Sequence, residues 1–252
     1  MRKRFATSRI VRKQSRLAHA FMRASVGKAI DDDYLLQLDN LTMLLDATKI
    51  TGLVDTDPVA TWEDQSGNSN DASQGTAANR ALYRTNILNG LPAVRFDGIN
   101  DYYTVTFGSD LVQPTTIITV ATHGDNTDFF YDGIVNTKRH TLHGTAAPGN
   151  PLVAYAGAVL DSTVNSEFPA SVFSVLYNGA NGYIRRNSTE LIAGNIGAQV
   201  LSGLTIGADY ATSAGRFLDG DIYQMLVIDG ELDTNTLINT ERFLIYKWGV
   251  AT

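Results

Sequence analysis

Cysteine is absent from the 252-residue chain, which excludes a disulfide framework and any cysteine-based zinc site. No stretch approaches the ~18 consecutive apolar residues of a transmembrane helix, so the sequence predicts no membrane span. Proline is scarce, with 6 residues, whereas glycine reaches 22 and many Asn and Asp stand in short clusters, as in turn-rich chains. With 44% hydrophobic residues the chain can bury an ordinary core, and packing alone must hold the fold.

Acidic residues are absent from residues 1–30, which carry nine of the 20 Lys and Arg side chains. Residues 31–252 therefore hold eleven bases (20 − 9) against 26 acids, a net charge of −15 (11 − 26). A basic arm on an acidic body commonly binds nucleic acid, an acidic protein surface or a membrane. The arm residues that we expect to make assembly contacts are Arg2, Lys3, Arg4, Arg9, Arg12, Lys13, Arg16 and Arg23.

The arm, residues 1–33, has several interpretations. Its arginines interrupt every apolar stretch, which argues against a secretory signal, whereas its Arg-rich, acid-free composition fits a mitochondrial transit peptide. Another interpretation is a solvated or nucleic-acid-binding tail. We favour an uncleaved arm clamped in an assembly, because a free, highly charged segment buries too little surface to order itself. Three Asp at 31–33 then reverse the charge, can cap a short helix at 34–38, and mark the start of a body domain at 34–252.

Short strands dominate the predicted structure of the body. Leu41–Asp46 is the first, and segments that are β-branched or aromatic and bounded by turn residues follow at short intervals. We predict a long structured loop at 64–80 and strands at 81–85, 91–96, 101–107, 115–123, 129–136, 152–155, 171–177, 182–186, 203–208 and 217–228. The strong helical pattern comes last, capped by Asp233 or Thr234 and stopped at Gly249. This pattern is typical of an all-β, antiparallel two-sheet sandwich with one C-terminal helix.

Three motifs carry a family resemblance. Residues 62–74 read WEDQSGNSNDASQ, residues 90–102 read GLPAVRFDGINDY, and residues 241–249 read ERFLIYKWG. In this order they resemble the W-x-D-x-S-G-N-x-N-D-A-x-Q, G-L-P-A-V-x-F-D-G-x-N-D-Y and closing-helix motifs of laminin G-like, concanavalin A-like domains of bacteriophage and bacterial surface proteins. The closing motif departs from the family's E-R-x-x-I-x-x-Y-L-x-x-K-W-G in its middle, where Phe243-Leu244-Ile245 stands.

The resemblance covers about residues 41–250. It implies that these residues form a jelly-roll sandwich of two curved antiparallel sheets. The extended basic arm precedes this sandwich in the chain. It implies little about activity, because this fold hosts lectins, hydrolases and purely structural modules.

The polar turn in the first motif has two interpretations. Asp64, Asn68, Asn70 and Asp71 offer the oxygen ligands that calcium prefers, but their spacing differs from the calcium-loop pattern. Asn and Asp side chains in turns more often hydrogen-bond the backbone of their own loop. We therefore favour the loop interpretation, with Trp62 filling the core, and predict no metal site.

Motifs of catalysis and cofactor binding are missing. There is no G-x-S-x-G and no P-loop. Glycosidases need two carboxyl groups flanking one bond, and none of the five Glu begins the E-x-D-x-x-E pattern of the concanavalin-like glucanases. We interpret Glu241 as structural, and expect His140 and His143 to be exposed polar residues rather than metal ligands. The sequence thus leads us to expect a protein that is not an enzyme and has no cofactor.

Aromatic side chains are the candidates for glycan binding. Adjacent tyrosines in a strand must point to opposite faces of the sheet, so one ring of such a pair faces away from the core. Aromatic residues in strands more often fill the core. The candidates that we select are Tyr102, Tyr103, Tyr131 and Tyr155.

The preferred interpretation is a non-enzymatic structural protein of a virion, as a bacteriophage capsid-decoration or tail-fibre component. Its arm would bind other virion proteins and its sandwich would be displayed outward, in a homo-oligomer or larger assembly without membrane contact. The alternative is a carbohydrate-binding adhesin that recognises host or environmental glycans. A hydrolase is a third class, which would show as polysaccharide cleavage lost on substitution of one carboxylate.

Overall fold

The computed structural model describes residues 32–123, 128–145, 151–165, 169–213 and 215–251. The chain divides after Leu38 into two units, Met1–Leu38 and Asp39–Thr252. In the first, the described element is the 3-10 helix η1 (Asp32–Gln37), near the helix predicted at 34–38. The Arg and Lys residues expected to make assembly contacts lie outside the described residues.

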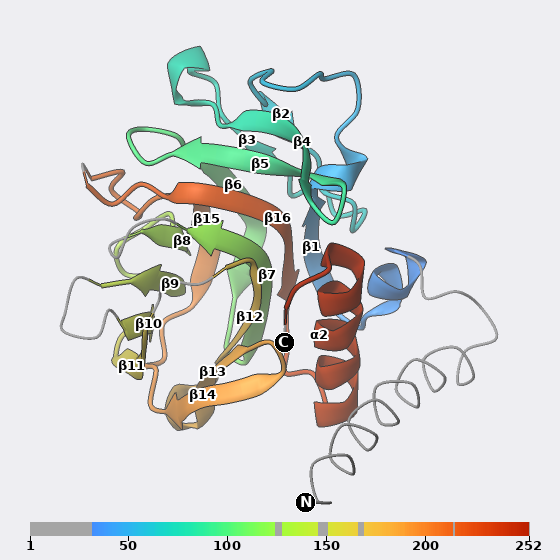
Figure 1. Cartoon of the computed structure of the whole chain (residues 1–252). Helices are drawn as coiled ribbons and strands as arrows, with labels where there is room; N and C mark the ends of the chain where they lie inside the picture. Colours follow the sequence, from blue (N-terminus) through green and yellow to red (C-terminus); the bar gives the residue numbers. More distant parts are fainter. Residues whose placement is uncertain (1–31, 124–127, 146–150, 166–168, 214, 252) are drawn as a thin grey trace, which may run out of the picture. The chain divides into compact units, whose positions relative to one another are not determined.

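The second unit is built from two antiparallel sheets (Figure 1). Sheet A has the order β14-β13-β12-β7-β16-β5-β4, and β1 also pairs with β16. Its strands are β1 (Leu41–Asp46), β4 (Leu82–Leu88), β5 (Leu91–Asp97), β7 (Thr115–His123), β12 (Ser171–Tyr177), β13 (Gly182–Arg186), β14 (Thr189–Gly194) and β16 (Asp219–Ile228).

Sheet B has the order β11-β10-β9-β8-β15-β6-β3-β2. Its strands are β2 (Thr61–Trp62), β3 (Ala72–Ser73), β6 (Tyr103–Leu111), β8 (Phe129–Gly133), β9 (Thr141–Gly144), β10 (Pro151–Tyr155), β11 (Val159–Asn165) and β15 (Leu201–Ile206). Short 3-10 helices connect some strands, namely η2 (Ala47–Lys49), η3 (Ala77–Asn79) and η4 (Gly179–Asn181).

The predicted all-β, antiparallel architecture is confirmed. Every predicted strand overlaps an observed one, and the first matches β1 at both ends. The sequence pattern missed β2, β3, β9, β11 and β14. These strands are short or rich in polar residues, so their sequences lack the alternation of apolar and polar residues that is typical of strands. Pairing with neighbouring strands determines their structure instead.

Aromatic rings from the two sheets meet in the core. The ring of Phe130 in β8 lies 5.2 Å from that of Phe173 in β12. The hydroxyl groups of Tyr131 and Tyr177, from the same two strands, are 3.0 Å apart. The pairing of β8 with β9 shifts between Phe129 and Tyr131, and this bulge turns two consecutive aromatic residues toward the core.

The helix α2 (Thr234–Trp248) has the predicted ends. The Asp233 carboxylate accepts hydrogen bonds from the backbone N–H groups of Asn235 and Thr236, as an N-cap does. Gly249 adopts a left-handed conformation with φ of 64°, which ends the helix. No helix in the described ranges is long and apolar enough to cross a membrane.

Motif residues anchor α2 to sheet A. Arg185 of β13 donates two hydrogen bonds to the Glu241 carboxylate, at 2.8 and 3.0 Å. The Trp248 indole N–H donates to the side-chain oxygen of Gln224 in β16 at 2.8 Å. The prediction that Glu241 is structural is therefore confirmed, and the closing motif attaches the helix to the outer face of sheet A.

The Asp64 carboxylate joins the two sheets. It follows β2 of sheet B, and it accepts the backbone N–H of Leu44 in β1 of sheet A at 2.8 Å. It also accepts the backbone N–H and hydroxyl of Ser66, at 2.9 and 2.7 Å, and the backbone N–H of Asn70 at 3.0 Å. One side chain therefore fixes both the turn and its attachment to β1.

The turn also hydrogen-bonds the edge of β1 that faces away from β16. The Asn68 amide donates to the carbonyl oxygens of Leu41 and Thr42, and the Asn70 amide donates to Thr42. Trp62 is fully buried in the core. These contacts confirm that the Asn and Asp residues of the first motif hold the loop.

We expect Asp64→Asn to destabilise the fold. The new amide N–H groups would face the backbone N–H groups of Leu44, Ser66 or Asn70, which are donors themselves and cannot accept a hydrogen bond. The free energy of unfolding should fall by on the order of 2 kcal/mol, measured by urea denaturation. The exposed Asp161 provides the matched control, and Asp161→Asn should change stability by less than about 0.5 kcal/mol. Equal effects of the two substitutions would contradict the role of Asp64.

Candidate functional site

A row of side chains crosses one face of sheet B. In the strand register, Thr61 pairs with Ser73, Ser73 with Thr104, and Thr104 with Thr205. Thr205 then pairs with Asp132 in β8. Directly paired residues share a face of the sheet, and neighbouring strands lie about 4.8 Å apart. We call the four hydroxyl-bearing residues Thr61, Ser73, Thr104 and Thr205 the hydroxyl row.

The hydroxyl row lies on the outer face of sheet B. Tyr103, next to Thr104, points the other way: its ring is fully buried, 5.8 Å from that of Phe96 in sheet A. Trp62, next to Thr61, is likewise buried. Thr61, Ser73 and Thr104 are exposed, so the row presents hydroxyl groups to solvent, while Thr205 is covered.

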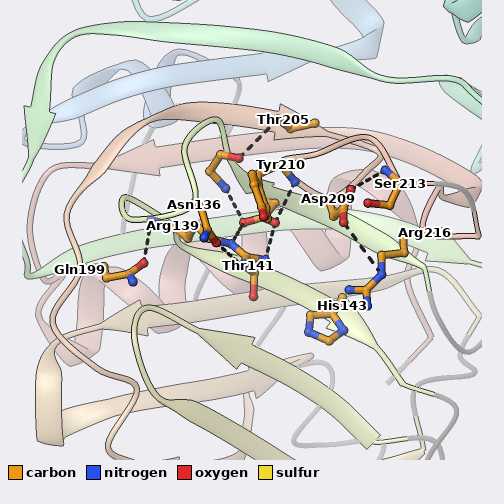
Figure 2. A network of polar contacts seen from close by, with 12 residues as sticks. Asn136, Arg139, Thr141, His143, Gln199, Thr205, Asp209, Tyr210, Ser213 and Arg216 are labelled. Carbon is orange, nitrogen blue, oxygen red and sulfur yellow. Dashed lines mark hydrogen bonds and ion pairs between the residues drawn. The ribbon is translucent and has the colours of Figure 1, made fainter.

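A buried ion pair lies beside the covered end of the row (Figure 2). The Arg139 guanidinium donates to both oxygens of Asp132, at 2.9 and 2.7 Å, and the Asp132 side chain is fully buried. The backbone N–H groups of Gly133 and Tyr210 also donate to this carboxylate. Burial lowers the pKa of Arg139, but the hydrogen bonds and charge of Asp132 outweigh it and raise that pKa, so the guanidinium stays charged.

Two tyrosine rings flank this guanidinium. The Arg139 guanidinium carbon lies 4.5 Å from the centre of the Tyr210 ring and 5.3 Å from that of Tyr155. Its backbone N–H donates to the side-chain oxygen of Gln199 at 3.1 Å, which fixes the loop that carries it. We call Asp132, Arg139, Tyr155 and Tyr210 the arginine–tyrosine cluster. Its tyrosines are half-buried, so each ring has a supported side and a solvent side.

Residues 209, 213 and 216 lie next to this cluster (Figure 2). Arg216 lies 3.9 Å from the Asp209 carboxylate and sits over the ring of Phe129 at 5.6 Å. The Phe129 ring stacks on that of His143 at 4.2 Å. Burial lowers the pKa of His143 to about 4, so this imidazole is neutral at pH 7.

The expectation of exposed histidines is wrong, since His143 is half-buried, and it is most clearly wrong for His140. Its side chain is fully buried and stacks on the Tyr177 ring at 4.2 Å, with Nε2 2.9 Å from the Gln199 carbonyl oxygen. Burial lowers its pKa to about 4. His140 thus belongs to the core, behind the outer face. In the part of the chain that the structure describes, no three His, Asp or Glu side chains gather as a metal site.

The structure divides the four candidate tyrosines into two pairs. Tyr103 and Tyr131 are fully buried between the sheets, so neither ring can reach a glycan. The alternation of β6 turns Tyr103 inward, and the bulge of β8 does the same for Tyr131. Tyr102 and Tyr155 are half-buried and belong to the outer face, where Tyr102 lies 6.4 Å from Phe217, ring to ring.

Sequence reasoning missed the hydroxyl row and Arg139. The alternation of Thr104 and Thr106 is visible in the sequence, but the row also needs Thr61, Ser73 and Thr205 from three other strands. Only the pairing register brings these hydroxyl groups into line. Arg139 precedes a strand that the sequence pattern did not predict, and its partner Asp132 is seven residues away on the preceding strand.

Comparison with known proteins gives a fold likeness. No family model matches the chain, and no curated protein sequence matches it. Among solved structures, the chain is similar to Trypanosoma rangeli sialidase in complex with sialic acid, with a TM-score of 0.57 and 12% identity. The match covers 84% of this chain and 34% of the sialidase, so the chain spans about a third of that protein's length.

Two further structures show the same likeness. Domain 4 of AbnA, a GH43 extracellular arabinanase from Geobacillus stearothermophilus solved with arabinotriose, matches with a TM-score of 0.55 and 12% identity, over 79% of this chain and 97% of that domain. A GH54 α-L-arabinofuranosidase soaked with a cyclic sulfate inhibitor matches with a TM-score of 0.59 and 15% identity, over 77% of this chain and 52% of that chain.

These likenesses correct the expectation that the protein is not an enzyme. The same fold occurs within chains of a sialidase, an arabinanase and an arabinofuranosidase. The expectation depended on a missing local pattern of Glu residues. Carboxylates that act together need only be close in the folded sheet, and strand register joins residues that are distant in sequence, as it does for the hydroxyl row.

Proposed function

We propose that this protein binds carbohydrate on the outer face of sheet B, as a sandwich of the concanavalin A-like, laminin G-like type. The observation that carries the proposal is the exposed hydroxyl row, with the half-buried Tyr102 two residues from Thr104 and the half-buried Tyr155 beyond the covered end of the row. Hydroxyl side chains both donate and accept hydrogen bonds, as the hydroxyl groups of sugars do. Tyrosine adds a flat apolar ring with a polar end, which suits the mixed surface of a sugar.

The arginine–tyrosine cluster orders tyrosine rings on this face, while its guanidinium charge is already paired with Asp132. The Arg139 guanidinium donates to both oxygens of Asp132 and to the side-chain oxygen of Asn136, and the rings of Tyr155 and Tyr210 lie against it. A ring held this way is ordered before any ligand arrives, which lowers the entropic cost of binding. We therefore assign Arg139 the role of a positioning residue for Tyr155.

Two of the similar solved structures contain a bound carbohydrate, which supports the proposal. The AbnA domain was solved with arabinotriose, and nearly its whole length matches this chain. The sialidase was solved with sialic acid. Carbohydrate is thus the ligand class in these two structures. The jelly-roll arrangement of the two sheets, which the family resemblance implies, is part of the proposal. Whether bound glycan is also cleaved is an outcome of the test below.

We expect the full chain to bind at least one surface polysaccharide on a glycan array. Tyr155→Ala should then weaken that binding about tenfold, or about 1.4 kcal/mol, measured by titration calorimetry. Tyr246, which is 62% exposed on α2, gives the matched control, and Tyr246→Ala should leave the affinity unchanged.

Reducing-end release from the bound polysaccharide, measured in the same samples, reports whether binding leads to cleavage. An array without any bound glycan would contradict the proposal. So would equal losses of affinity in the Tyr155→Ala and Tyr246→Ala variants.

The charge asymmetry favours a second candidate function. We propose that the basic arm attaches the protein to an acidic surface of a virion, which then displays the sandwich outward. Nine bases and no acid in residues 1–30 precede residues 31–252, whose net charge is −15, so the two parts attract surfaces of opposite charge. This role is compatible with glycan binding by the same chain.

Replacing the arm's Lys and Arg residues by Gln should abolish incorporation into particles, because attachment then loses its charge attraction. The thermal unfolding of the body should be unchanged. Deletion of residues 1–30 should have the same effect, measured by protein content of purified particles. Normal incorporation of either variant would contradict this function.

A further inference from the structure

A cavity lies at the exposed end of the hydroxyl row. Its volume is about 220 Å³, and Thr61, the first residue of the row, forms part of its wall. The segment after β1, which includes η2, provides Ile50 and Leu53, and Pro58 completes an apolar side. Polar groups in the lining come from Asp46, Lys49, Thr51, Glu63 and Gln65. The cavity therefore combines apolar walls with hydroxyl, carboxylate and amide groups.

Trp62 also lines this cavity, and its indole N–H lacks an acceptor. The nitrogen is buried, and no hydrogen-bond partner lies within reach in the described ranges. The other tryptophan differs, since the Trp248 indole N–H donates to Gln224 at 2.8 Å. Because Trp62 lines the cavity and Trp248 does not, the Trp62 indole reports on what occupies the cavity.

The walls of the cavity are rigid. Glu63 and Gln65 stand on either side of Asp64, whose carboxylate holds Leu44, Ser66 and Asn70. The backbone N–H of Gln65 itself donates to the Leu44 carbonyl at 2.8 Å. The polar groups of the cavity are thus fixed in position by the contacts that join the two sheets, which favours selective binding.

We propose that this cavity holds one sugar unit of a glycan whose chain continues over the hydroxyl row. The inference rests on the proposed carbohydrate binding and adds a defined end to the binding face. A volume of about 220 Å³ equals that of about seven waters, and lies below the ~300–1,000 Å³ of pockets for drug-sized ligands. It suits a single ring, with Glu63 accepting a hydrogen bond from a sugar hydroxyl group.

The two indole N–H groups provide the test within one molecule. The ¹⁵N-labelled full chain would be titrated with arabinotriose, xylotriose and cellotriose, and the two indole N–H resonances followed by NMR. We expect one of these trisaccharides to shift the Trp62 resonance, because a sugar in the cavity changes the surroundings of a side chain that lines it. The Trp248 resonance, whose acceptor is already present, should stay in place.

A pair of matched variants tests the cavity independently. Glu63→Gln should weaken binding of the same trisaccharide about tenfold, whereas Glu190→Gln, on an exposed residue of β14, should leave it unchanged. If a trisaccharide binds while Trp62 and the Glu63→Gln variant show no effect, the cavity proposal is wrong and carbohydrate binding stands. If no trisaccharide binds the wild-type chain, the cavity proposal fails, while carbohydrate binding by the sheet fails only if the glycan array also shows no bound glycan.

Discussion

Four hydrogen bonds to the Asp64 carboxylate hold together the part of the molecule on which the proposed site depends. One of them reaches Leu44 in sheet A, while Asp64 itself follows β2 of sheet B. Because the turn also hydrogen-bonds the free edge of β1, the two sheets are joined at this side by polar contacts as well as by the core. The cavity beside β2 and the start of the hydroxyl row therefore have a fixed geometry.

The same sheet geometry explains the composition of the outer face. Alternation along β6 turns Tyr103 into the core and leaves Thr104 outside, and register repeats the hydroxyl group across the neighbouring strands. At the other end, the buried Asp132 is compensated by Arg139, whose guanidinium lies against Tyr155. A buried carboxylate without such a partner would be strongly destabilising. The ion pair thus serves both stability and the position of a candidate ligand-stacking ring.

Much of the fold could be predicted from the sequence, because its signals are local. Turn residues stand at the ends of the strands, and Asp233 and Gly249 mark the ends of the last helix. The polar side chains of the first motif hydrogen-bond the backbone of their own loop. The site could be predicted only in part. Tyr155 was selected, but Tyr131 was selected with it, since a bulge that turns a ring inward leaves no sequence signal. The hydroxyl row and the Asp132–Arg139 pair depend on register between strands, which local patterns do not specify.

The central claim is that a glycan lies across the outer face of sheet B, from the cavity beside Trp62 toward Tyr155. A crystal structure of the full chain with arabinotriose, xylotriose or cellotriose, whichever binds most tightly, tests it most directly. The account predicts sugar density over Thr61, Ser73 and Thr104 on the exposed part of the hydroxyl row. Density on sheet A, or at the ends of the sandwich with the hydroxyl row unoccupied, would contradict it.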